Sequence, residues 1–95
     1  MFIVLLKFSK NKGKVGQFME GHKKWIKDGF DDGIFMLAGS LQPGLGGGII
    51  AYGVSRDALE KRITQDPFVK ENIVKAEVIE IEASVTDVRL DFLRD

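Results

Sequence analysis

The sequence predicts an α+β fold of the ferredoxin-like type, with strands and helices in the order β-α-β-β-α-β. Three observations support this prediction. Four apolar runs have the length and composition of strands, two stretches have apolar residues at helical spacing, and a chain of 95 residues is the size of one domain. Two helices would then cover one face of a four-stranded antiparallel sheet.

The first half of the chain begins with a strand and continues with a helix. Phe2–Phe8 is rich in strand-forming residues and has no helical period. From Val15 to Phe30 the apolar residues recur with the i, i+3, i+4, i+7 spacing of an amphipathic helix. Its polar side carries Glu20, Lys23, Lys24 and Lys27.

A hairpin is expected next. A charged break over Asp28–Gly33 precedes a second strand at Ile34–Ala38, and Ile49–Val54 reads as a third strand. Pro43, Gly44 and the run Gly46–Gly48 lie between them, and this composition predicts a flexible link.

The second half repeats the helix-then-strand pattern. Ser55 is a suitable N-cap for a shorter helix that ends near Gln65. Asp66-Pro67-Phe68 predicts a turn or short helix, because Asp caps well and Pro tolerates the first helical position. The alternation of glutamate with valine and isoleucine over Val74–Ala83 predicts the fourth strand.

The expected domain therefore covers residues 1–83 and leaves a tail at 84–95. Val85, Val88 and Phe92 give the tail a roughly helical spacing, which is compatible with a short helix, an exchanged arm or a frayed end. Because the first three strands are apolar at consecutive positions, the sheet face without helices also needs a cover. A second copy of the chain is the simplest one, so a homodimer is expected.

Composition excludes several function classes. Fourteen basic and 14 acidic residues balance, so nothing draws the chain to nucleic acid or to an anionic membrane. With no cysteine and one histidine, thiolate chemistry and the usual zinc sites are excluded, and no metal, haem, flavin or nicotinamide is expected. The apolar start at Phe2–Leu6 is too short for a signal peptide, which favours a cytoplasmic protein.

His22 and Asp66 are the candidate catalytic residues. His22 lies in the apolar stripe of the first helix, where it is either a buried structural residue or a general base in an apolar wall. Asp66 is either only a helix cap or also the carboxylate that orients the imidazole. The βαββαβ order lets the end of the second helix approach the middle of the first.

Two other polar or glycine-rich groups favour structural interpretations. The glycines of Gly44–Gly48 lead into a strand and not into a helix, so they do not match a phosphate-binding loop. Asp28, Asp31 and Asp32 are expected to be solvated surface residues and not a cation site.

The sequence resembles the YciI-like, or YCII-related, domain family over about residues 1–82. The resemblance lies in His22-Lys-Lys-Trp25-Ile26 with Gly29, in Leu37–Leu41, and in Asp66–Val69. It implies a dimeric α+β barrel with an active site built around a His and an Asp, at the positions of His22 and Asp66. The sequence departs from the family pattern at Ser40, where many relatives have proline, and in its glycine-rich loop and tail.

Two functions follow from these residues. One is a cofactor-independent enzyme of the isomerase or lyase type, in which His22 moves a proton of a small metabolite, with aromatic and carbonyl-containing compounds as candidates. Asp66 would orient the imidazole, while Trp25, Ser40 and Phe68 would contact the substrate. The alternative is a binding or regulatory module that uses the same dimer cleft without turnover.

Overall fold

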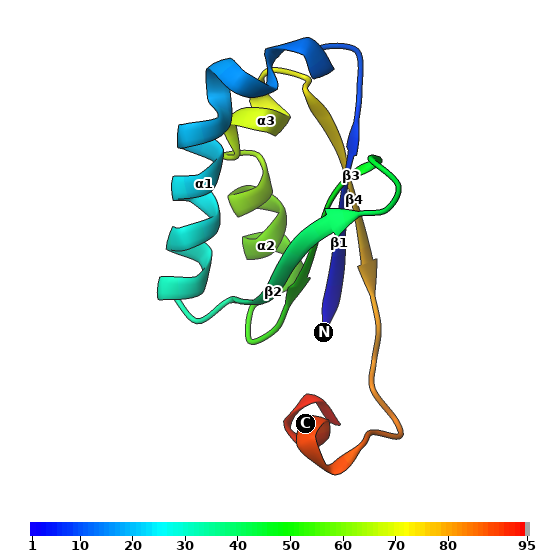
Figure 1. Cartoon of the computed structure of the whole chain (residues 1–95). Helices are drawn as coiled ribbons and strands as arrows, with labels where there is room; N and C mark the ends of the chain where they lie inside the picture. The colour runs from blue at the N-terminus through cyan, green and yellow to red at the C-terminus, as the bar shows by residue number, and fades with distance from the viewer. Residues whose placement is uncertain (95) are drawn as a thin grey trace.

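The predicted βαββαβ order is confirmed by a computed structural model that describes residues 1–94 (Figure 1). Strand β1 spans Phe2–Phe8 and is followed by helix α1 at Val15–Asp31. Strands β2 and β3, at Phe35–Leu41 and Gly46–Ala51, form the hairpin. The remaining elements are α2 at Arg56–Ile63, α3 at Pro67–Lys70, β4 at Val74–Glu80, and short 3-10 helices at Lys12–Lys14 and Val88–Arg94.

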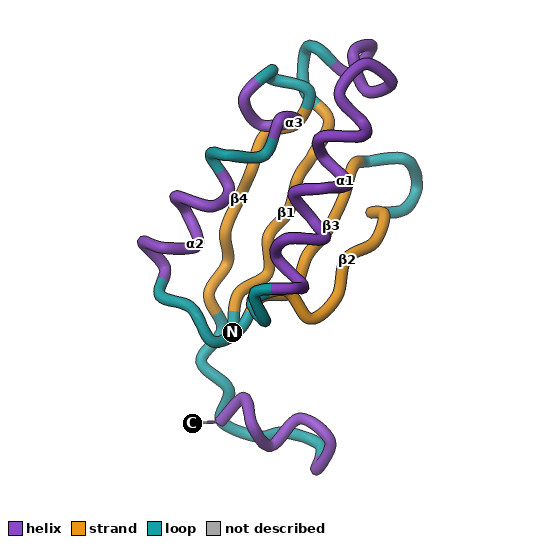
Figure 2. The backbone as a smooth tube through the Cα atoms, turned by 90° about the vertical axis from the view of Figure 1, so that its left-hand side faces the viewer, coloured by secondary structure: helices purple, strands orange, loops and turns teal. Residues whose placement is uncertain are grey.

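The four strands form one antiparallel sheet in the order β2-β3-β1-β4. Strand β1 is central, because it pairs with β3 on one side and with β4 on the other. All three α-helices of the described residues lie on one face of this sheet, with α1 beside α3 (Figure 2). This arrangement places the middle of α1 next to the start of α3.

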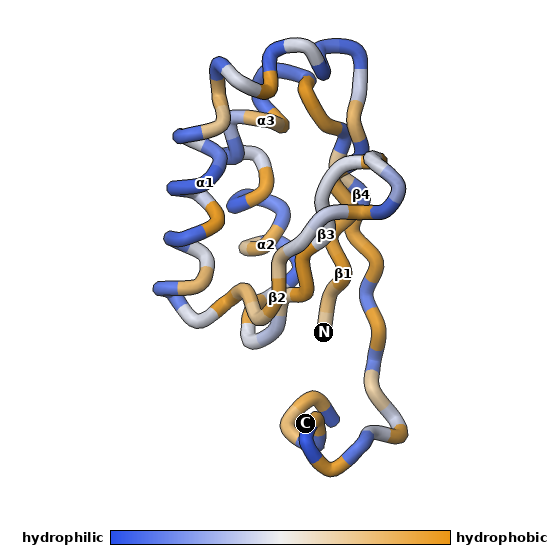
Figure 3. The backbone as a smooth tube through the Cα atoms, viewed as in Figure 1, coloured by the Kyte–Doolittle hydropathy of each residue, from blue (hydrophilic) through white to orange (hydrophobic). Residues whose placement is uncertain are grey.

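The core lies between the helices and the sheet. On β1 the alternate residues Phe2, Val4 and Leu6 are buried and face the helices. Helix α1 has its hydrophobic residues on the side nearest the sheet and its hydrophilic residues on the outer side (Figure 3). The period-2 strand pattern and the helical stripe therefore meet in one apolar layer.

The prediction of a flexible link at Gly46–Gly48 was wrong. These three glycines belong to β3 and pair with both neighbouring strands. Gly46 has a φ of 131°, and a Cβ there would collide with the Leu6 carbonyl oxygen. Because glycine has no side chain, β3 can approach β1 closely at this position. The low strand propensity of glycine does not predict this close approach. Because β2 pairs with these glycines, it extends to Leu41.

Two strands end earlier than predicted. Strand β3 stops at Ala51 and not at Val54, because the chain turns away through Gly53, whose φ is 76°. Strand β4 stops at Glu80 and not at Ala83, because Glu80 pairs with Phe2 at the start of β1. Beyond this point two hydrogen bonds join the residues: the Ile81 N–H donates to the Met1 carbonyl oxygen, and the Met1 amino group donates to the Ile81 carbonyl oxygen.

The tail forms a short helix, one of the expected alternatives. The 3-10 helix at Val88–Arg94 buries Leu93, and the Tyr52 hydroxyl donates a 2.9 Å hydrogen bond to the Phe92 carbonyl oxygen. Figure 1 shows that this segment extends away from the sheet. Asp95, the last residue of the predicted tail, lies outside the described residues.

The sheet face without helices carries an apolar row across all four strands. Strand register places Leu37 opposite Ile50, Ile50 opposite Ile3, and Ile3 opposite Ile79. Leu37 is 53% exposed and Ile79 is 39% exposed. This face of the described chain is thus hydrophobic and only partly covered.

Within residues 1–94, no helix combines the length and the apolar composition needed to cross a bilayer. The same residues contain no cluster of three or more His, Cys, Asp or Glu side chains suited to a metal ion. Asp28, Asp31 and Asp32 instead form ion pairs with Lys24, Lys27 and Arg62.

Candidate active site

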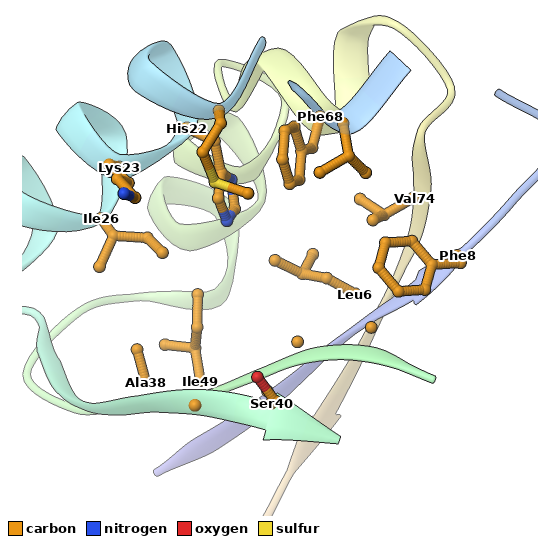
Figure 4. Close-up of a pocket in the computed structure, with 16 residues that line it drawn as sticks. Leu6, Phe8, His22, Lys23, Ile26, Ala38, Ser40, Ile49, Phe68 and Val74 are labelled. Atoms are coloured by element: carbon orange, nitrogen blue, oxygen red, sulfur yellow. The ribbon is translucent and has the colours of Figure 1, made fainter. Parts of the chain in front are cut away.

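A cavity of about 440 Å³ lies between α1 and the sheet. Its walls are mainly apolar, and His22, Lys23 and Ser40 supply its polar side chains (Figure 4). Volume and lining fall in the range that small-molecule sites occupy. The apolar wall includes Leu6, Phe8, Met19, Ile26, Ile49 and Phe68.

His22 reaches this cavity from the middle of α1. It lies one turn after Met19 and one turn before Ile26, both of which face the same space. Its side chain is 13% exposed, so the ring is enclosed without being sealed from solvent. In Figure 4 the ring projects from the helix into the cavity, with one nitrogen at its tip.

Asp66 is positioned by the start of α3. It is the N-cap of this helix, and its Oδ1 accepts a 3.0 Å hydrogen bond from the Phe68 backbone N–H. Pro67 at the first helical position favours this local geometry. The carboxylate is completely buried, so its contacts are fixed by the surrounding chain.

The structure brings His22 and Asp66 together. The His22 Nδ1 lies 2.7 Å from the Asp66 Oδ1, a distance typical of a charge-assisted hydrogen bond. Because the carboxylate only accepts, Nδ1 carries the proton and donates it. The neutral imidazole is then held in the tautomer whose Nε2 has a free lone pair, and this nitrogen faces the cavity.

Aromatic rings fix the plane of the imidazole. Phe68 stacks on His22 with ring centroids 3.9 Å apart and an interplanar angle of 2°. Phe68 also lines the cavity, as does Ser40 from β2. The three predicted residues His22, Phe68 and Ser40 therefore share one space.

Trp25 is placed differently from the other predicted contact residues. Its ring centroid lies 6.0 Å from that of His22, but Trp25 does not line the cavity. It is buried, packs edge-on against Phe35, and donates from its indole nitrogen to the Arg62 carbonyl oxygen at 2.8 Å. Its contacts join α1 to α2 and to the sheet.

Sequence reasoning missed two features of the cavity. Lys23 was assigned to the polar side of α1, yet it lies at the cavity edge. Gly47 was assigned to a link, yet it lies between Leu6 and Ser40 in the strand register and forms part of the cavity floor. The sequence carries no signal for either feature, because the helical period places Lys23 on the polar side and glycine is depleted in strands.

Comparisons with known proteins establish the fold. No protein-family model matches the sequence, and no curated protein matches it significantly. Among solved structures, the chain is similar to 5-chloro-2-hydroxyhydroquinone dehydrochlorinase from Burkholderia phenoliruptrix, solved in complex with 2,5-dihydroxybenzoquinone. The TM-score is 0.69 at 12% identity, over 88% of this chain and 96% of the other. The chain thus has the same α+β fold as this enzyme.

Proposed function

We propose that the protein is a cofactor-independent proton-transfer enzyme of the isomerase or lyase type. Its substrate is a small aromatic or carbonyl-containing metabolite. The observation that carries this proposal is the hydrogen bond from His22 Nδ1 to Asp66, which leaves Nε2 as a proton acceptor facing the cavity. Imidazole is suited to this role because it titrates nearest to neutral pH.

The chemistry needs only these two side chains. His22 Nε2 removes a proton from a carbon or hydroxyl group of the substrate, and the buried Asp66 carboxylate stabilises the resulting imidazolium. Return of the proton to another atom completes an isomerisation. Departure of a leaving group with its electron pair completes an elimination.

Two likenesses support this assignment. YciI-like domains, which residues 1–82 resemble, have a proposed active site built around a His and an Asp. The structural neighbour is named as a dehydrochlorinase of a small hydroxylated ring, and removal of hydrogen and chloride from such a ring is an elimination. Together they favour proton abstraction over hydrolysis.

A comparison of two variants tests the proposal. Wild type, His22→Gln and Lys24→Gln would be assayed for chloride release from 5-chloro-2-hydroxyhydroquinone, the compound named for the structural neighbour, and for deuterium exchange into small ketones and lactones. We expect His22→Gln to lower kcat by about 10²- to 10⁴-fold, the usual contribution of a general base. Lys24→Gln should keep the wild-type rate, because Lys24 is an exposed residue paired with Asp28.

Two results would contradict the proposal. One is an unchanged kcat in His22→Gln for a compound that the wild type converts. The other is tight binding of such compounds without any proton exchange or elimination, which would support the binding or regulatory module instead.

The proposal includes a homodimer that buries the apolar row of the helix-free face. Leu37, Ile50, Ile3 and Ile79 form this row across all four strands, and a second copy offers the same row in return. A self-complementary contact of this kind is typical of twofold dimers. The two cavities would lie on the outer, helical sides of the paired sheets.

A further inference from the structure

The lysines of α1 are not equivalent. Lys24 and Lys27 each form an ion pair with an aspartate four residues later, at 3.0 Å and 2.6 Å. The residue four positions after Lys23 is Lys27, so this pairing is not open to Lys23. No carboxylate within residues 1–94 lies within ion-pair distance of Lys23, which nevertheless lines the cavity.

The cavity edge is therefore positively charged. Lys23 is the only lining residue that carries a permanent charge, and no carboxylate lines the cavity within the described chain. The Asp66 carboxylate is fully buried behind His22 and already accepts two hydrogen bonds. A second cation is close, because the Lys12 Nζ lies 4.8 Å from the centroid of Phe8, a lining residue.

The cavity floor is open above Gly47. Gly47 lies between Leu6 and Ser40 on the helix-facing side of the sheet. A Cβ at Gly47 would meet only the Gly39 carbonyl oxygen, at an ordinary distance of 3.5 Å, so the space above it is open. In Figure 4, His22 approaches from α1 while Ser40 and Ile49 rise from the strands opposite.

We infer that the site takes a planar, single-ring organic anion whose acidic group is held by Lys23 and whose ring lies over Gly47. This inference rests on the proposed function, since it places the ring within reach of His22 Nε2. The apolar walls receive the ring, and the cationic edge receives a carboxylate or an ionised hydroxyl group. Lys23 is thus a specificity-determining residue, distinct from the proton-transfer pair.

Binding of two matched probes tests the assignment without requiring turnover. Benzoate and benzamide have the same ring and differ in charge. Their dissociation constants would be measured by calorimetry or NMR titration on wild type, Lys23→Gln, Lys23→Arg and the control Lys24→Gln. We expect wild type to prefer benzoate, and Lys23→Gln to reduce this preference by about tenfold, the effect of one charge-assisted hydrogen bond. Lys23→Arg should keep the preference, and Lys24→Gln should not alter it.

A second pair of variants tests the position of the ring. Gly47→Val places a side chain in the cavity floor and should weaken both probes together, leaving their ratio unchanged. Gly13→Val is the control, because Gly13 lies outside the cavity, in the short 3-10 helix at Lys12–Lys14, and nothing lies within 4 Å of its Cβ. Circular dichroism and thermal unfolding would verify that both variants fold.

Three results would overturn the inference. They are equal affinity of wild type for the two probes, an unchanged preference in Lys23→Gln, and no binding of either probe to wild type at millimolar concentration. Failure of the proton-transfer proposal gives a different result, in which His22→Gln leaves turnover unaffected while the benzoate preference still depends on Lys23.

Discussion

Asp66 joins local folding to the proposed chemistry through a single oxygen atom. Its Oδ1 accepts hydrogen bonds from both the Phe68 backbone and the His22 ring, while its Oδ2 is buried without a partner among residues 1–94. A buried carboxylate with one unsatisfied oxygen is costly in free energy. The rest of the fold must offset this cost, as is common where a side chain is retained for function.

Substitutions at Asp66 should separate its two roles. Asp66→Ala removes the cap of α3, worth about 1 kcal/mol, and leaves the His22 donor without an acceptor, so we expect a loss of about 2–3 kcal/mol in the free energy of unfolding. Asp66→Asn keeps a side-chain oxygen for the cap and should lose about 1 kcal/mol less. Urea denaturation followed by circular dichroism measures both. Equal losses in the two variants would contradict the capping contribution.

Individual residues of the site differ in how well the sequence predicts them. His22 and Asp66 could be predicted to pair because each has a recognisable place in the sequence. His22 is a polar residue within an apolar helical stripe, and Asp66 marks the start of a helix. Lys23 could not be assigned to the cavity, because a helical period separates the two faces of a helix but does not show where a neighbouring cavity opens beside it. Such edge positions depend on tertiary packing.

The contact between α1 and β2 depends on Gly29. This residue is buried near the end of α1, and a Cβ there would collide with the Phe35 ring. Phe35 in turn packs against Trp25 and Phe30. The helix can therefore lie close to the strand only where a side chain is missing.

Two glycine substitutions in the same helix should have opposite effects. Gly29→Ala should destabilise the protein by about 1–3 kcal/mol, because the Phe35 ring must shift within a packed core. Gly16→Ala should stabilise it by about 0.5 kcal/mol, because nothing lies within 4 Å of its Cβ and alanine is the better helix former. Thermal unfolding of the two variants beside wild type checks this, and a stabilised Gly29→Ala protein would refute the packing argument.

The type and order of the helices and strands were predictable from the sequence, but the residues at which some strands begin or end were not. Apolar runs located every strand, and capping signals at Ser55 and Asp66 located the starts of α2 and α3. Because glycine is depleted in strands, the sequence predicts a link at residues 46–48. In the structure these glycines form backbone pairs with both β1 and β2, and this pairing outweighs the low strand propensity of glycine. The pairing depends on the assembled sheet and cannot be derived from the local sequence.

At the scale of the whole molecule, the two sheet faces differ in how they are covered. Three helices bury one face, whereas the row from Leu37 to Ile79 is left partly open. Consecutive apolar residues in the strands predicted a second buried face. Residues 1–80 contain no further layer over this row, so the row is available to the proposed homodimer.

A substitution in the apolar row should dissociate the proposed homodimer. We expect wild type to sediment as a dimer at micromolar concentration, with more than about 1,000 Å² buried in the contact. Leu37→Lys should sediment as a folded monomer. Leu37 is 53% exposed in the single chain, so the charge of the introduced lysine would be buried only in the dimer.

Leu45→Lys is the matched control for this experiment. Leu45 is similarly exposed, at 50%, but lies in the hairpin loop outside the row, so this variant should remain dimeric. A monomeric wild type, or a dimer that tolerates Leu37→Lys, would show that the row is not the contact surface.

The shared oxygen of Asp66 also has an evolutionary consequence. A descendant that does not need the proposed proton transfer can replace His22 and keep the cap of α3, whereas loss of Asp66 removes that cap. If selection acted only on folding, Asp66 would therefore be retained longer than His22. Among relatives that have drifted from catalysis to ligand binding, we expect aspartate or asparagine to persist at this position after the histidine has been replaced.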